Sequence, residues 1–200
     1  MKKLIFLLFL LPALATVGSA QEARQDVSLS FMGTIQPYVN GGVNNVTAKA
    51  TLGAGMLLSY RYQLTPNGAM EANYSYSRYT EKFTTNFAAA RVYTSVQEAT
   101  FAYVRTIPFK RYNPFLELGG GVQFFVPEGS IKTTTYDTEQ TEAIVGMFGG
   151  GIAYELSPSW DLRVQYRGYV SKPQTFDLKT FSTGHYYIVS QPAIGFAYHF

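Results

Sequence analysis

The last eight residues of the chain, 193–200, read Ala-Ile-Gly-Phe-Ala-Tyr-His-Phe. In an extended strand successive side chains point to opposite faces, so this stretch has two unlike faces. One face carries only large apolar side chains, which are those of Ile194, Phe196, Tyr198 and Phe200. The other face is small or polar. This alternation predicts a β-strand whose two faces meet different surroundings.

The same alternation returns along most of the chain, without a helical period. It marks eight predicted strands, at residues 26–38, 47–62, 68–81, 92–107, 113–126, 141–155, 160–171 and 185–200. Extended runs separated by turn-forming residues are typical of an all-β protein. We therefore predict an all-β fold, an eight-stranded antiparallel up-and-down barrel.

The connections between the predicted strands alternate between short and long. The short ones are residues 64–67, 108–111 and 157–159, which hold Pro or Asn at turn positions. The long ones are residues 39–46, 82–91, 127–140 and 172–184. Membrane barrels have short periplasmic turns and long external loops, whereas a soluble sandwich has no reason to sort its loops in this way. The pattern predicts a transmembrane β-barrel with both termini at the short-turn end.

We assign the apolar face of each strand to lipid and the polar face to the lumen. In the first strand, for example, Leu29 and Phe31 lie opposite Ser30. Closing the barrel removes open edges, whose N–H and C=O groups would stay unsatisfied in hydrocarbon. One residue breaks the pattern, because Gln97 falls on the lipid face, and a bulge or a register change near Glu98 would correct it.

The N-terminus has the order of a secretory signal peptide. Two lysines precede an apolar run over residues 4–14, and small residues end at Ala20. A membrane-spanning helix needs about 20 apolar residues, so a membrane anchor is the weaker alternative. We predict a signal peptide at residues 1–20 and a barrel domain at residues 21–200, exported to the periplasm and inserted in the bacterial outer membrane.

The composition narrows the class of protein. Without the two lysines of the predicted signal peptide, 14 bases face 13 acids, and this balance argues against a nucleic-acid binder. The chain has no cysteine, which excludes disulfides and a thiolate metal site. Its 16 tyrosines and 15 phenylalanines suit two membrane interfaces. Tyr62, Tyr112 and Trp160 are expected at the periplasmic one.

The alternate apolar residues at the C-terminus resemble the signal by which bacterial outer-membrane barrels are recognised for insertion. That signal would consist of Ile194, Phe196, Tyr198 and Phe200. Together with the predicted signal peptide and the alternating loops, it makes the chain similar to the eight-stranded OmpA/OmpX-type barrels. The resemblance implies insertion by the barrel assembly machinery. We expect a monomer surrounded by outer-membrane lipids and lipopolysaccharide.

Few residues offer catalytic or cofactor chemistry. The glycine triplets 119–121 and 149–151 lie inside predicted strands and are not followed by the Lys-Ser/Thr of a phosphate loop, so we assign them to packing. A lipid A-modifying enzyme would need a Ser–His pair oriented by an acid. Only His185, with Asp177 as the acid, and His199 are candidates. Two isolated histidines make a poor metal site. We predict no enzyme, no metal and no cofactor.

Basic residues in or beside the long loops could pair with phosphates of lipopolysaccharide. They are Arg78, Lys82, Arg91, Lys132, Lys172 and Lys179. For each of them a solvated loop charge is the alternative.

Four inward charges are expected at similar heights in the lumen. They are Arg61, Glu71, Glu117 and Arg163. Because burying lone charges is costly, we predict that they form a salt-bridge cluster, with Arg167 and Glu98 above it. A lumen filled by side chains favours a structural role or adhesion and ligand contact through the loops. A narrow porin-like channel is the first alternative and the lipid A-modifying enzyme the second, and the sequence does not identify a loop ligand.

Overall fold

The computed structural model describes residues 24–37, 39–41, 46–84, 89–130, 141–171 and 187–200. The predicted signal peptide, residues 1–20, lies outside these ranges. Within them, no helix is long and apolar enough to cross a membrane.

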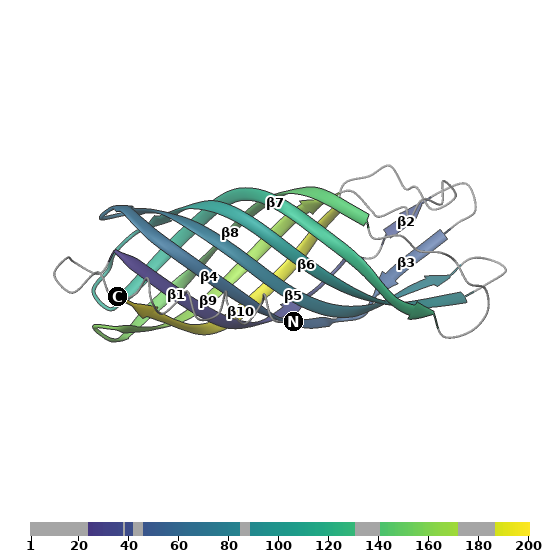
Figure 1. Cartoon of the computed structure of the whole chain (residues 1–200), viewed down its shortest axis with the longest axis horizontal. Helices are drawn as coiled ribbons and strands as arrows, with labels where there is room; N and C mark the ends of the chain where they lie inside the picture. Colours follow the sequence, from purple (N-terminus) through teal and green to yellow (C-terminus); the bar gives the residue numbers. More distant parts are fainter. Residues whose placement is uncertain (1–23, 38, 42–45, 85–88, 131–140, 172–186) are drawn as a thin grey trace, which may run out of the picture.

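Eight long strands form a closed antiparallel barrel (Figure 1). They are β1 Gln25–Thr34, β4 Gly53–Thr65, β5 Gly68–Thr84, β6 Ala89–Thr106, β7 Tyr112–Ser130, β8 Thr141–Ser157, β9 Trp160–Ser171 and β10 Tyr187–His199. Each pairs with the next along the chain, and β1 pairs with β10 to close the ring. The predicted fold class is confirmed.

Two short strands, β2 Val39–Gly41 and β3 Val46–Ala50, extend one side of the barrel. They correct the predicted strand 47–62, which is interrupted. β3 and β4 both pair with β5, but Ala50 lies opposite Glu81 whereas Ala54 lies opposite Arg78. One extra residue is therefore inserted between them. Thr51 bridges the gap by donating its N–H to the Thr80 carbonyl (2.9 Å).

The polar connection expected at residues 82–91 is also corrected. β5 continues to Thr84 and β6 begins at Ala89, so most of this segment belongs to a paired ladder. The polar residues of this segment were interpreted as a loop. A strand that extends beyond the membrane can be polar, because it no longer needs an apolar face.

Gln97 is accommodated without the expected bulge. The β5–β6 and β6–β7 ladders both run through Glu98 without a shift, and the irregularity of β6 lies between Val92 and Thr94. Gln97 does lie on the outer face, where its Oε1 accepts a hydrogen bond from the hydroxyl of Tyr74 (3.0 Å). A neighbouring tyrosine, rather than a change of register, satisfies the amide oxygen.

The start of β1 and the end of β10 lie together at the end of the barrel that holds the short turns (Figure 1). Phe200 donates its N–H to the Gln25 carbonyl, and His199 donates its own to the Ser159 carbonyl (both 3.0 Å). In the β6–β7 turn, Lys110 has a φ of 55°, the left-handed region that favours glycine. β2 and β3 lie at the opposite, long-loop end.

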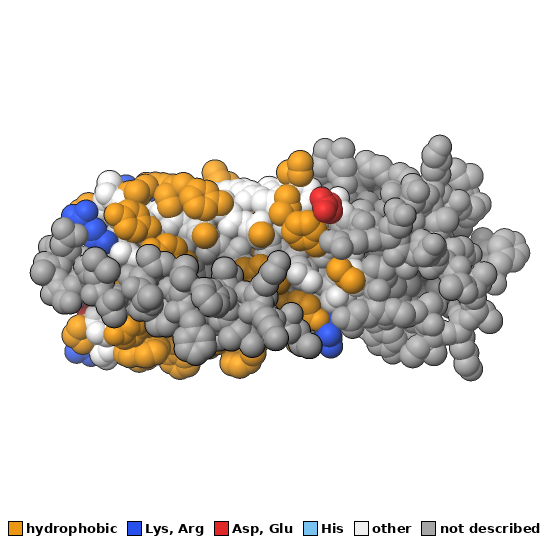
Figure 2. Space-filling view, viewed as in Figure 1, with side chains coloured by type: hydrophobic (Ala, Val, Ile, Leu, Met, Phe, Trp, Pro, Cys, Tyr) orange, Lys and Arg blue, Asp and Glu red, His pale blue; other side chains and the backbone are white. Residues whose placement is uncertain are grey.

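The outer wall is apolar, as the alternation predicts. Leu29, Phe31, Leu118 and Phe196 are each more than half exposed, and apolar side chains cover much of the visible wall (Figure 2). A continuous apolar surface of this extent is stable only against another apolar medium. The inner face holds buried serines, the buried glutamines Gln123, Gln165 and Gln191, and the buried acids and arginines of the lumen.

Candidate functional site

The lumen is crossed by polar layers, because every second residue of each strand points inward. Among the described residues, five acids and three arginines are buried there, and they are Asp26, Glu71, Glu98, Glu117, Asp161, Arg61, Arg163 and Arg167. Charged groups are almost never fully buried unless they are paired. The pairing therefore determines whether the lumen is open or closed.

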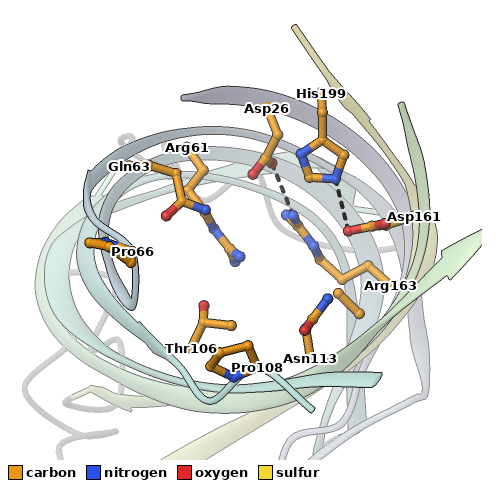
Figure 3. Close-up of a pocket in the computed structure, with 11 residues that line it drawn as sticks. Asp26, Arg61, Gln63, Pro66, Thr106, Pro108, Asn113, Asp161, Arg163 and His199 are labelled. Atoms are coloured by element: carbon orange, nitrogen blue, oxygen red, sulfur yellow. Dashed lines mark hydrogen bonds and ion pairs between the residues drawn. The ribbon is translucent and has the colours of Figure 1, made fainter. Parts of the chain in front are cut away.

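The layer nearest the short turns is an ion-pair network, of which Figure 3 draws Arg61 and the pair of Arg163 with Asp26. Arg61 Nη2 lies 2.6 Å from Glu71 Oε2, and Arg163 Nη2 lies 2.9 Å from Asp26 Oδ1. Arg163 Nη1 is 3.7 Å from the same Glu71 oxygen, which links the two pairs. The ring of Phe115 lies 4.8 Å from the Arg61 guanidinium and 5.8 Å from that of Arg163. The ion pairs connect the four strands β1, β4, β5 and β9 across the lumen, and Phe115 adds β7.

A second layer is centred on Arg167. Its Nε lies 3.7 Å from Glu117 Oε1, and its Nη2 donates to Thr100 Oγ1 (3.0 Å). Glu117 lies over the bare backbone of Gly149, where a Cβ atom would meet the Glu117 carboxylate. Gly149, the first residue of the second glycine triplet, therefore provides the space that this side chain occupies, in agreement with the assignment of the triplet to packing.

A third layer, toward the long loops, surrounds Glu98. Its carboxylate accepts hydrogen bonds from Ser75 Oγ, Gln123 Nε2 and Gln191 Nε2. The donors come from three other strands. Above this layer the apolar side chains of Tyr79, Val96 and Phe125 pack together.

The structure thus brings together three of the four expected cluster residues, Arg61, Glu71 and Arg163. Glu117 is paired with Arg167 one layer higher instead. Sequence reasoning missed Asp26, although it shares the inward face with the serines of β1 and its side chain is 2 % exposed. The alternation of faces was the signal that could have found it.

The lumen opens at the short-turn end into a cavity of about 180 Å³. Asp26, Arg61, Arg163 and the pair of His199 with Asp161 line it (Figure 3). His199 Nε2 and Asp161 Oδ2 share a hydrogen bond of 2.8 Å. His199 therefore faces the lumen mouth and not the lipid-facing wall, where a lipid A-modifying site would lie.

The other catalytic candidates, His185 and Asp177, lie outside the described residues. In the parts of the chain that are described, no group of three or more His, Asp or Glu side chains could hold a metal ion.

Of the bases expected near lipopolysaccharide, Arg78 is the one whose side chain is described. It is exposed on the outer face of β5, near the long-loop end. Its Nε donates to the hydroxyl of Tyr76, and its guanidinium lies 5.4 Å from the centroid of that ring.

A family model described as the outer membrane protein β-barrel domain matches residues 7–200. The chain belongs to this family. This outer-membrane β-barrel lies in the bacterial outer membrane, and its resemblance to small barrels of this kind is confirmed.

Solved structures similar to this outer-membrane β-barrel agree with the assignment. OprG of Pseudomonas aeruginosa matches with a TM-score of 0.63 and 11% identity, over 90% of this chain and 97% of that chain. Neisserial surface protein A matches with a TM-score of 0.58 and 12% identity, over 88% of this chain and 97% of that chain. Ail, the attachment invasion locus protein of Yersinia pestis, matches with a TM-score of 0.50 and 17% identity, over 90% of this chain and 100% of that chain. At these identities the likeness shows the fold alone. A search of curated proteins by sequence finds no significant match.

Proposed function

We propose that this outer-membrane β-barrel is a wall protein with a closed lumen, which stabilises the envelope and makes contacts through its external loops. The observation that carries this proposal is the set of three polar layers across the lumen. Side chains from non-adjacent strands meet in each layer. In two of the layers they come from opposite walls, Arg163 on β9 with Glu71 on β5 and Gln191 on β10 with Glu98 on β6.

The geometry of the barrel supports a closed lumen. Eight strands leave an interior just wide enough for side chains to fill. An ion that passed would have to separate Arg61 from Glu71, and breaking a buried pair costs about 3–5 kcal/mol. Arg61 and Arg163 line the cavity at the short-turn end, whereas Glu71, which both arginines approach, is not among its lining residues.

The structural neighbours support a role for the loops. One is named for attachment and invasion, and another is named as a surface protein. We infer adhesion or ligand contact through the long connections, and we infer that Arg78 and Tyr76 contact lipopolysaccharide phosphates at the outer wall. A guanidinium beside an aromatic hydroxyl offers both charge and hydrogen bonds to a phosphate.

Planar-bilayer recording tests the closed lumen. The intact barrel should give small, intermittent conductance, whereas the double variant R61A/E71A should give a larger and steadier one. E142Q is the matched control, because Glu142 is exposed and lies outside the polar layers. A steady, large conductance of the intact barrel would favour the narrow channel.

Binding arrays test the loops. The folded barrel is presented to glycans, lipids and matrix proteins, beside a variant in which residues 131–140 and 173–184 are replaced by short Gly-Ser linkers. Binding that the variant loses supports contact through the loops. Equal binding by both proteins, or none by either, would remove adhesion from the proposal and leave the wall role alone.

A further inference from the structure

The short-turn end of the barrel is basic on its outside. Four bases are exposed there, and they are Arg24, Arg105, Lys110 and Arg111. The half-buried Glu155 is the one acid beside them that is not buried in the lumen, among the residues that the structure describes. Lys and Arg side chains are visible at this end in Figure 2. We call these four residues the basic rim.

The basic rim lies beside a girdle of aromatic side chains. Tyr112 and Tyr154 pack at 5.0 Å between ring centroids, and Trp160 and Tyr198 pack at 5.1 Å. Tyr112 and Trp160 are about half exposed, as expected of interface anchors. Aromatic girdles mark the level at which a barrel passes from hydrocarbon to lipid headgroups. The bases beyond them are therefore level with the headgroups.

The bases face outward and not into the lumen mouth. On β6, Arg105 follows Phe101 and Tyr103 on the same face, and both of these aromatic residues are exposed on the outer wall. Lys110 and Arg111 form the tip of the adjoining turn. Arg24 precedes β1, where its carbonyl accepts the N–H of Gln63 (2.7 Å). None of the four is among the residues that line the mouth cavity.

We propose that the basic rim binds the headgroups of anionic phospholipids in the periplasmic leaflet. Guanidinium groups form paired, charge-assisted hydrogen bonds with phosphate, and a base near an anionic membrane surface contributes about 1 kcal/mol, or roughly fivefold in affinity. The rim is spread along the wall at headgroup depth, which suits lipids that surround the barrel better than a partner seated in the mouth. This inference concerns the leaflet opposite the external loops and is independent of the proposed function.

The chain carries its own reporter for this site. Trp160 is its single tryptophan and lies in the girdle. It is on β9, two strands away from β7, whose first residue follows Arg111. Two strand spacings amount to about 10 Å. Lipid that collects along the rim therefore lies near Trp160.

Brominated lipids test the proposal, because bromine quenches tryptophan fluorescence at short range. The folded barrel is placed in phosphatidylcholine vesicles that contain an equal, small fraction of brominated phosphatidylglycerol or brominated phosphatidylcholine. We expect phosphatidylglycerol to quench Trp160 with an apparent affinity about fivefold higher or more. This preference should fall as salt screens the charges.

Variants separate the rim from other causes. R105Q/K110Q/R111Q should lose most of the preference for phosphatidylglycerol, whereas E142Q, changed at the opposite end of the barrel, should keep it. Both should still run faster unboiled than boiled on a denaturing gel, which shows that they are folded. Equal quenching by the two lipids, or a preference that the triple variant retains, would overturn the proposal. Salt-dependent binding of an acidic protein to the rim without any lipid preference would also overturn it.

Discussion

Glu71 is the point at which the lumen network is most vulnerable. Its side chain is fully buried, and one of its oxygens lies 2.6 Å from Arg61 and 3.7 Å from Arg163. E71A would leave Arg61 buried without a counter-ion, whereas Arg163 would keep Asp26. Removing one partner of a buried pair costs about 3–5 kcal/mol. We expect a loss of that size in the free energy of unfolding.

A double-mutant cycle separates the energy of the interaction between Arg61 and Glu71 from the effect of the side-chain volume that each substitution removes. R61M/E71A has neither charge, so part of the loss should return, with a coupling of about 1–3 kcal/mol. E117A is a comparison within the same lumen. The partner of Glu117, Arg167, is 3.7 Å away and keeps a hydrogen bond to Thr100. The free energy of unfolding should therefore fall less in E117A than in E71A.

The assay is urea unfolding of the barrel in lipid vesicles, followed by Trp160 fluorescence. The reasoning fails if E71A unfolds at the same urea concentration as the parent. It also fails if the single effects of R61M and E71A simply add in the double variant. Either result would mean that these side chains are hydrated separately and that water lines the lumen.

Three further predictions concern the turn, the C-terminus and the N-terminus. K110G should raise the stability of the barrel by about 1 kcal/mol, because glycine adopts the left-handed φ of 55° without strain; an unchanged or lower urea midpoint would contradict this. Deleting Phe200 should sharply reduce the amount of barrel in outer-membrane fractions while export to the periplasm continues, and a normal yield would remove the C-terminal residues from the insertion signal. Mass spectrometry of the mature protein should find Gln21 at its N-terminus, and a chain that retains residues 1–20 would refute the signal peptide.

The fold was largely predictable because a period of two is a strong signal in a membrane wall. Every strand must offer lipid an apolar face. An error in the predicted start of a strand therefore does not change the prediction that Leu29 and Phe31 point outward. The interruption between β3 and β4 could not be predicted in the same way, because Thr51 and its neighbours show no change in alternation. Its cause is a one-residue shift against β5.

The site was less predictable than the wall. Alternation tells which side chains enter the lumen, but their heights depend on strand register and tilt. The predicted height of Glu117 was slightly wrong, so the sequence placed it with Arg61 whereas the structure places it with Arg167. Gln97 was misjudged for a related reason, because the Tyr74 hydroxyl that it meets belongs to another strand.

The unequal lengths of the strands have a consequence for whatever meets the cell surface. β6 has 18 residues and β7 has 19, whereas about 9–11 tilted residues cross a bilayer. The surplus of about eight residues, at about 3.3 Å each and tilted by about 45°, raises this side of the barrel roughly 20 Å above the membrane. On this side the paired strands therefore project beyond the membrane as an ordered part of the sheet. A partner that docks there meets backbone already ordered by its ladder, so binding need not bear the entropy of fixing it.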